Sequence, residues 1–140
     1  MLQKQISVFL ENKRGRLAEI TTILGENDID MGAICVADTA DFGILRIIAD
    51  KPDLAAKLLK EKGFAVSITE VIAISVDDRP GGLAAALRTL DEYEINIEYM
   101  YHYVRKNERR ATMIIRVGQP AEALEKLKNA PLDLRTDGNI

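Results

Sequence analysis

Apolar residues recur along the chain at two spacings, one typical of strands and one typical of helices. Every second position from Ile6 to Leu10 is apolar, which predicts a strand over 4–10. From Leu17 to Leu24 the apolar residues instead recur every three or four positions, as on one face of a helix. The chain is therefore predicted to begin with a strand and an amphipathic helix over about 14–27.

One more helix and three more strands complete the first half of the chain. Pro52 suits the first turn of a helix and Gly63 suits its end, which predicts a helix over 52–62. Residues that favour turns fill 38–41. The predicted strands of this half cover 31–37, 42–49 and 65–69.

The same pattern returns 66 residues later. The identical pairs at this shift are Ile6 with Ile72, Gly15 with Gly81, Leu17 with Leu83, Ala18 with Ala84, Leu24 with Leu90 and Ile29 with Ile95. An internal repeat of this kind indicates two copies of one folding unit. We therefore predict two modules, at 1–70 and 71–140.

The second copy is predicted to contain the same elements as the first. Its predicted strands cover 71–76, 97–104 and 111–117, with a short last strand near 132–135, and its predicted helices cover 80–93 and 120–129. A polar turn at 105–110 joins two of these strands, and the residues at 137–140 are expected to form a frayed tail.

Each copy has the order β-α-β-β-α-β, which predicts an α+β fold of two ferredoxin-like modules in tandem. Right-handed crossovers then give each module an antiparallel sheet with both helices on one face. Only Glu70 separates the last strand of the first copy from the first strand of the second. Since helices cover one face of each sheet, we expect the other faces to be covered by each other or by a second chain, which favours a homodimer.

The strand at 97–104 has an aromatic face. Under strict alternation, one face shows Ile97, Tyr99, Tyr101 and Tyr103, and the other shows Glu98, Met100, His102 and Val104. We expect Tyr99, Met100 or Tyr101 to line an apolar pocket for the side chain of a ligand.

The loops at 12–17 and 78–83, each between a strand and a helix, suit an anion. Their glycines allow the backbone to approach a ligand closely, and Pro80 fixes the φ angle of a first helical turn. The unpaired N–H groups of that turn and the helix dipole favour a carboxylate. The same features also describe an ordinary helix start, and the loops alone do not decide between the two.

A polar residue follows each of these two helices. Asp30 and Asn96 stand just before the second strand of their module, and their side-chain oxygens are acceptors for an ammonium group. We expect this end of the second strand to lie near the first loop of the same or an adjoining module. Donors for a carboxylate beside an acceptor for an ammonium describe an amino acid. Each polar residue is also a common turn former.

These segments resemble the ACT domain family, whose members are small regulatory modules that bind amino acids. The family pattern is a strand, a polar residue, Pro-Gly, a leucine at the helix start and an Asn-Ile-like step into the second strand. The second copy matches it at 74–84 and 94–97, and the first copy matches it at 8–18 and 28–31 with Arg14 in place of proline. The resemblance covers about residues 4–135.

The chain is most similar in layout to stand-alone tandem ACT proteins, which carry no catalytic domain. This resemblance implies an allosteric amino-acid sensor in which one module's first loop holds the ligand and the second strand of a neighbouring module closes over it. The ligand-binding residues indicated by the resemblance and by the loop chemistry are Asn12, Arg14, Gly15, Arg16, Leu17, Asp30, Met31, Asp78, Pro80, Gly81, Gly82, Leu83, Asn96, Ile97, Tyr99, Met100 and Tyr101.

Composition argues against several other functions. The formal net charge of −3 produces a long-range field that disfavours nucleic acid and anionic membranes. A single cysteine, Cys35, excludes a disulfide within the chain and a four-thiolate metal site, and we expect no metal and no cofactor. The sequence has no stretch of roughly 20 apolar residues and no signal-peptide pattern, so we expect a cytoplasmic protein.

Three other classes of protein are alternatives to an amino-acid sensor. His102 and Cys35 fall in different modules without a catalytic motif, so we expect no enzyme; Lys13 to Arg16 only faintly imitates the phosphate loop of an acylphosphatase. An RNA-binding module would need stacking aromatics on a basic face, and here only the tyrosines are present. A ligand-free regulatory subunit that docks on an enzyme of amino-acid metabolism is the main alternative.

Overall fold

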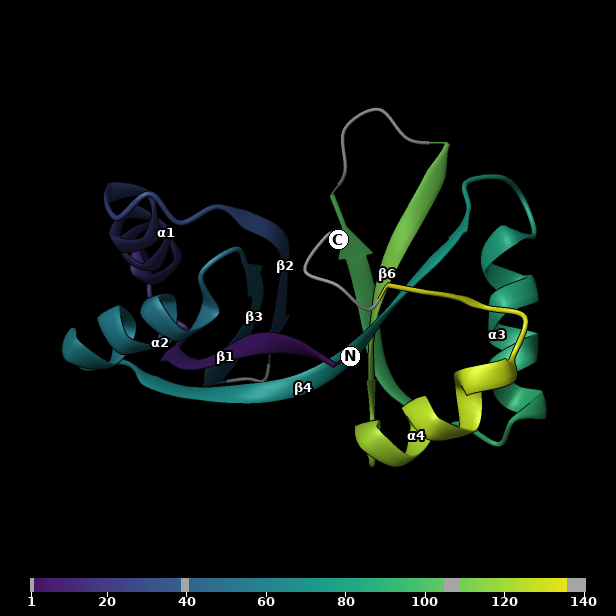
Figure 1. The fold of residues 1–140 in the computed structure, drawn as a ribbon. Helices are drawn as coiled ribbons and strands as arrows, with labels where there is room; N and C mark the ends of the chain where they lie inside the picture. Colours follow the sequence, from purple (N-terminus) through teal and green to yellow (C-terminus); the bar gives the residue numbers. More distant parts are fainter. Residues whose placement is uncertain (1, 39–40, 105–108, 136–140) are drawn as a thin grey trace. The chain divides into compact units, whose positions relative to one another are not determined.

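The computed structural model describes residues 2–38, 41–104 and 109–135 (Figure 1). The predicted turns at 38–41 and 105–110 lie partly outside these residues, and the predicted tail at 137–140 lies wholly outside them.

The chain divides into two compact units. The first module comprises residues 4–69, and the second comprises residues from Glu70 onward together with the first residues of the chain. The elements of the first module are β1 (Gln3–Glu11), α1 (Arg16–Glu26), β2 (Met31–Asp38), β3 (Phe42–Ala49) and α2 (Pro52–Glu61). Those of the second are α3 (Gly82–Glu92), β5 (Ile97–Tyr103), β6 (Arg110–Val117), α4 (Pro120–Lys126), the 3₁₀ turn η1 (Leu127–Asn129) and β7 (Asp133–Leu134). Strand β4 (Ala65–Asp77) contributes to both.

Each module contains the predicted β-α-β-β-α-β order. In the first module the strand order is β2-β3-β1-β4, and in the second β4 lies between β7 and β6, with β5 at the far edge. Strand β3 pairs antiparallel with both β1 and β2, and β6 pairs antiparallel with both β4 and β5. The prediction of two ferredoxin-like modules in tandem is thereby confirmed.

A separate aliphatic core lies between the sheet and the helices of each module. In the first module the residues that form it include Ile6 and Val8 of β1, Leu45 and Ile47 of β3, Ile20 and Leu24 of α1, and Leu59 of α2. In the second module they include Ile72 and Ile74 of β4, Met113 and Ile115 of β6, Leu90 of α3 and Leu127. Because both helices of a module contribute to one core, they lie on the same face of its sheet (Figure 1).

Strand β4 runs unbroken for 13 residues through both modules. Two strands were predicted on either side of Glu70, and they are one continuous strand. The segment has neither glycine nor proline and is rich in β-branched residues, so nothing in its sequence interrupts an extended backbone. The two modules are therefore joined without a linker.

Strict alternation fails at the start of β5. The pairing register shifts between Ile97 and Tyr99, which leaves Glu98 as an extra, bulged residue. Ile97 therefore packs against the core together with Met100, and it does not share a face with the tyrosines as alternation predicts. The matching shift between Met31 and Ala33 places the same bulge in β2.

Among the described residues, no helix is both long enough and apolar enough to cross a membrane.

Two leucines of α2 test the assignment of the first core. Leu59 is fully buried, whereas Leu54 is 41% exposed on the same helix. We expect Leu59→Ala to lower the free energy of unfolding of the first module by about 2–5 kcal/mol, because it removes buried methyl groups and leaves a cavity. Leu54→Ala should change it by less than about 0.5 kcal/mol. Urea denaturation followed by circular dichroism measures both, and equal losses would show that the core is misassigned.

Candidate functional site

The two loops predicted to bind a carboxylate have the same backbone geometry. Gly15 and Gly81 have φ angles of 90° and 86°, in the left-handed region that favours glycine, and each is the N-cap of the helix that follows. For this reason α1 and α3 begin two residues later than the sequence pattern predicts.

Backbone hydrogen bonds repeat from one loop to the other. In the first loop the N–H of Lys13 donates to the carbonyl of Glu11 (2.7 Å) and that of Arg16 to the carbonyl of Lys13 (3.3 Å). The second loop forms the corresponding bonds from Arg79 to Asp77 (3.0 Å) and from Gly82 to Arg79 (3.0 Å). Arg14 therefore allows the same turn that Pro80 forms in the second loop.

Free backbone donors are available at the start of both helices. Neither α1 nor α3 has a side-chain hydrogen bond at its N-cap. The N–H groups of Leu17 and Leu83 lie in the first turn of their helices. At this place a helix has no carbonyl one turn earlier that could accept from them. Together with the helix dipole, they form a region suited to a carboxylate.

One residue makes the second loop tighter than the first. A Cβ atom on Gly82 would lie 2.0 Å from the carbonyl oxygen of Asp77, a distance that no side chain tolerates. Its counterpart in the repeat is Arg16, which is partly exposed. The first loop thus presents a long cationic side chain where the second presents only backbone.

The two loops also differ in charge. Residues 11–16 contain Glu11, Lys13, Arg14 and Arg16, for a sum of +2, whereas residues 77–82 contain Asp77, Asp78 and Arg79, for a sum of −1. The ammonium of Lys13 lies 2.6 Å from Glu11 and, through this hydrogen bond and its charge, lowers the pKa of that exposed carboxyl. In the second loop, Arg110 reaches Asp77 at 2.6 Å. Positive charge is therefore in excess only at the first loop.

A pocket lies beside each loop, at equivalent places in the repeat. The first-module pocket has a volume of about 330 Å³ and lies between Glu11, Arg16 and Glu19 on one side and the segment Lys62–Ala65 on the other. The second-module pocket, of about 160 Å³, lies between Asp77, Gly82 and Arg110 on one side and Pro131–Asp133 on the other. The second wall of each pocket was not predicted from the sequence, in which Gly63 after α2 was the only signal for it.

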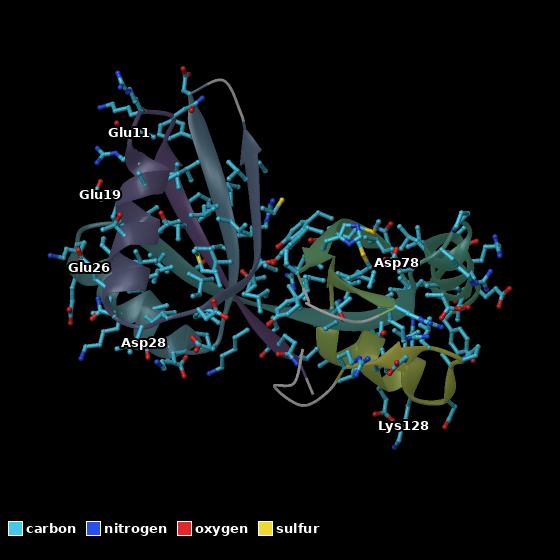
Figure 2. The ribbon with its side chains drawn as sticks, turned by 90° about the horizontal axis from the view of Figure 1, so that it is seen from above. Glu11, Glu19, Glu26, Asp28, Asp78 and Lys128 are labelled. Carbon is cyan, nitrogen blue, oxygen red and sulfur yellow. The ribbon has the colours of Figure 1, made fainter. Side chains whose placement is uncertain are left out.

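The strand register places Asp30 and Asn96 far from the loop of their own module. Glu11 pairs with Phe42 at one end of β3, and Met31 pairs with Ala49 at the other, seven residues away. At about 3.4 Å per residue, this separates the two ends by roughly 24 Å. In Figure 2, Glu11 lies near one end of α1 and Asp28 near the other.

The second module has the same arrangement. Asp77 pairs with Arg110 at the loop end of β6, and Ile97 pairs with Val117 at the opposite end. One ligand therefore cannot contact the loop and the Asn96 side of a single module, so of the two expected arrangements only an adjoining module or chain is compatible with the register.

The three predicted pocket residues of β5 point to different faces. Tyr99 and Tyr101 stack on the face away from the helices, with ring centroids 6.5 Å apart, and Tyr101 is buried. Met100 packs against the core on the opposite face. These residues therefore do not line one pocket together within the module.

The described residues contain no group of three or more His, Cys, Asp or Glu side chains placed to hold a metal ion. His102 is exposed on β5, and Cys35 is a free, half-buried cysteine on β2.

Comparison with known proteins identifies the fold and the family pattern. The family model of the ACT domain pair matches residues 1–140, which confirms the predicted resemblance. The crystal structure of protein BT0572 from Bacteroides thetaiotaomicron is similar at a TM-score of 0.86 and 44% identity, over 99% of this chain and 96% of that one. The ligand-free regulatory subunit of aspartate kinase from Thermus thermophilus is similar at a TM-score of 0.63 and 18% identity, over 91% and 92% of the two chains. The aspartate kinase regulatory subunit from Thermus flavus gives 0.61 and 19% over the same shares. No curated protein matches the sequence significantly.

Two glycines of the first module test the geometry of the loop. An added Cβ would meet no atom within 4 Å at Gly15 or at Gly25, so only backbone conformation separates them. We expect Gly15→Ala to lower the free energy of unfolding by about 1 kcal/mol, because φ is positive there. Gly25→Ala should raise it by about 0.5 kcal/mol, because Gly25 is helical. Urea denaturation measures the free energy of unfolding of both variants. Changes of the same sign in the two variants would contradict the assigned loop geometry.

Proposed function

Because the chain belongs to the ACT domain pair family, we propose that it is a non-catalytic regulatory protein that binds a free amino acid at interfaces between ACT modules. The observation that carries the proposal is the recurrence of one loop geometry, with a left-handed glycine followed by uncapped helix N–H groups, in both modules. The two copies share this backbone although their side chains differ, as expected if the backbone itself binds the ligand.

In this proposal the loops bind the carboxylate of the ligand. In the segments Gly15 to Leu17 and Gly81 to Leu83, the N–H groups of Leu17 and Leu83 donate to it, because those of Arg16 and Gly82 bond within the loop. Asn12 and Asp78 lie beside it in the same loops. The excess of positive charge at residues 11–16 favours the first loop. We therefore propose that the first loop binds a carboxylate more tightly than the second.

The ammonium of the ligand is bound by a different module. Asp30 and Asn96 are exposed acceptors at the end of the sheet opposite the loop, so they serve a ligand that is held by the loop of a neighbouring module or of a second chain. A ligand that bridges two modules makes different contacts in different arrangements of those modules, and it therefore binds these arrangements with different affinities. This difference in affinity allows the ligand to shift the equilibrium between them.

We further propose that the partner that supplies the second face is another copy of this chain. Strand β2 is the outer strand of the first module, and its side chains Ile34 and Val36 are 47% and 48% exposed. An apolar strand with an unpaired edge tends to associate with another strand. An enzyme of amino-acid metabolism is then the partner that responds to the ligand-dependent change.

A thermal-shift screen against individual amino acids tests ligand binding. At about a hundred times the dissociation constant, a ligand contributes roughly 2.7 kcal/mol, which for this chain length raises the melting temperature by about 9 °C. We expect one amino acid, or a few of related chemistry, to produce such a shift. Absence of a shift with every amino acid would contradict the proposal and favour a docking subunit without a ligand.

Paired variants then locate the ligand at the loop. Asp78→Ala removes an exposed loop residue, and Asp91→Ala makes the same change at an exposed position near the end of α3. We expect only Asp78→Ala to change the affinity for the amino acid, measured by calorimetry. Equal affinities for both variants, with Asn12→Ala also without effect, would place the ligand elsewhere.

Association through β2 is tested by a charge at its exposed face. Ile34→Lys should raise the dissociation constant of the dimer at least tenfold, because a lysine on an edge strand opposes its pairing with a second strand. Leu54→Lys puts the same charge on an exposed position of α2 and should leave association unchanged. Sedimentation over a range of protein concentrations measures both. A chain that stays monomeric, or a dimer that is indifferent to Ile34→Lys, argues against this interface.

A further inference from the structure

The second module has a pocket at the end of the sheet opposite its loop. It has a volume of about 280 Å³ and is lined by the residues that lead into β5, by the end of β6 and by the start of α4. Among its lining residues are Glu94, Asn96, Glu98, Gly118 and Gln119. Of the predicted site residues, Asn96 lies here, away from the loops.

In the first module, two of the chain's own side chains bind the equivalent backbone. The ammonium of Lys51 donates to the carbonyl oxygen of Asp28 at 2.6 Å and lies 3.7 Å from the carboxylate of the same residue. The carboxylate of Asp50 accepts a hydrogen bond from the backbone N–H of Asp30 at 3.0 Å. An ammonium and a carboxylate are thus held side by side by residues 28–30.

The register fixes which residues correspond in the second module. Met31 pairs with Ala49 and Ile97 pairs with Val117, each just before the same bulge, so Asp50 and Lys51 correspond to Gly118 and Gln119. The residues before the strand also match, because Asp28 and Glu94 both have left-handed backbones, with φ angles of 53° and 59°. The backbone of the second module therefore offers the same carbonyl and N–H, but the two charged side chains are missing.

These groups have no substitute partner nearby. Among the residues that the structure describes, no hydrogen bond is formed by the N–H of Asn96 and no ion pair by the carboxylate of Glu94. The other charges of the pocket are matched within the module: Glu98 lies 3.6 Å from Arg116, and Glu122 lies 4.0 Å from Lys126. The pocket thus keeps one exposed carboxylate without an ion pair, that of Glu94, whose counterpart Asp28 lies beside the Lys51 ammonium in the first module.

We propose that this pocket is a second ligand site, distinct from the loops, for a free α-amino acid. The ammonium of the ligand takes the place of the Lys51 ammonium and contacts the carbonyl and carboxylate of Glu94. Its carboxylate takes the place of the Asp50 carboxylate and accepts from the N–H of Asn96. The first module thus supplies the ammonium and the carboxylate from its own side chains, Lys51 and Asp50, whereas the second module takes both charges from a ligand in solution.

The substitution Gln119→Lys tests the proposed site directly, because it supplies an ammonium at the position that corresponds to Lys51. A lysine fits the backbone, since Gln119 and Lys51 are both N-caps with similar φ angles, −131° and −127°. Ala121→Lys is the matched control: it adds the same charge at an exposed residue of α4 outside the pocket lining.

The readout is the set of backbone amide signals of the whole chain, followed by two-dimensional NMR while individual α-amino acids are added at millimolar concentration. We expect at least one of them to move the signals of residues 94–98 and 117–119. Gln119→Lys should weaken this response at least tenfold, and Ala121→Lys should leave it unchanged. The double variant Asn12→Ala/Asp78→Ala, which alters both loops, should retain the response, and this separates the pocket from either loop site.

Ethylammonium chloride and sodium acetate, each carrying half of the ligand, test the need for both charges. Each should bind at least tenfold more weakly than the amino acid. The proposal is overturned if no amino acid moves the signals around Asn96, if Gln119→Lys leaves the response intact, or if ethylammonium alone binds as tightly as the amino acid.

Discussion

The antiparallel register of each four-stranded sheet is the constraint on which the rest of the structure depends. It places the glycine loop at one end of the module and the start of the second strand at the other, roughly 24 Å away. A ligand that needs both ends must therefore draw them from two modules. The same register makes the two copies comparable residue by residue. For this reason, the charged side chains that the second module lacks can be identified from their counterparts in the first.

The fold was predictable because its determinants are local and occur twice. Alternation, helical spacing and the glycine and proline positions each identified an element in both copies, and two agreeing copies are stronger than one. The exceptions have local physical causes. Gly15 and Gly81 delay the helices by two residues because their φ angles are positive, and the bulge at Glu98 turns Ile97 to the core, which no alternating pattern can indicate.

The candidate site was predictable only where backbone geometry defines it. The loops were identified from glycine and proline, whose conformational preferences are intrinsic to the residue. The pocket walls at Lys62–Ala65 and Pro131–Asp133 come from segments about 50 residues further along the chain, which only the tertiary fold brings to the loops. The contrast between Lys51 and Gln119 was visible in the sequence, but its meaning required knowing that Lys51 folds back onto Asp28.

The outer strand β2 has a consequence for how the protein behaves in bulk solution. Residues 31–38 read Met-Gly-Ala-Ile-Cys-Val-Ala-Asp, a segment with a single charge and no proline, and Ile34 and Val36 are half exposed. Natural sheets usually protect such edges with lysine, proline or a covering element, since a bare one templates the growth of cross-β aggregates. A preparation in which this strand is left uncovered is therefore expected to precipitate or to form fibrils, and the net charge of −3 opposes that association.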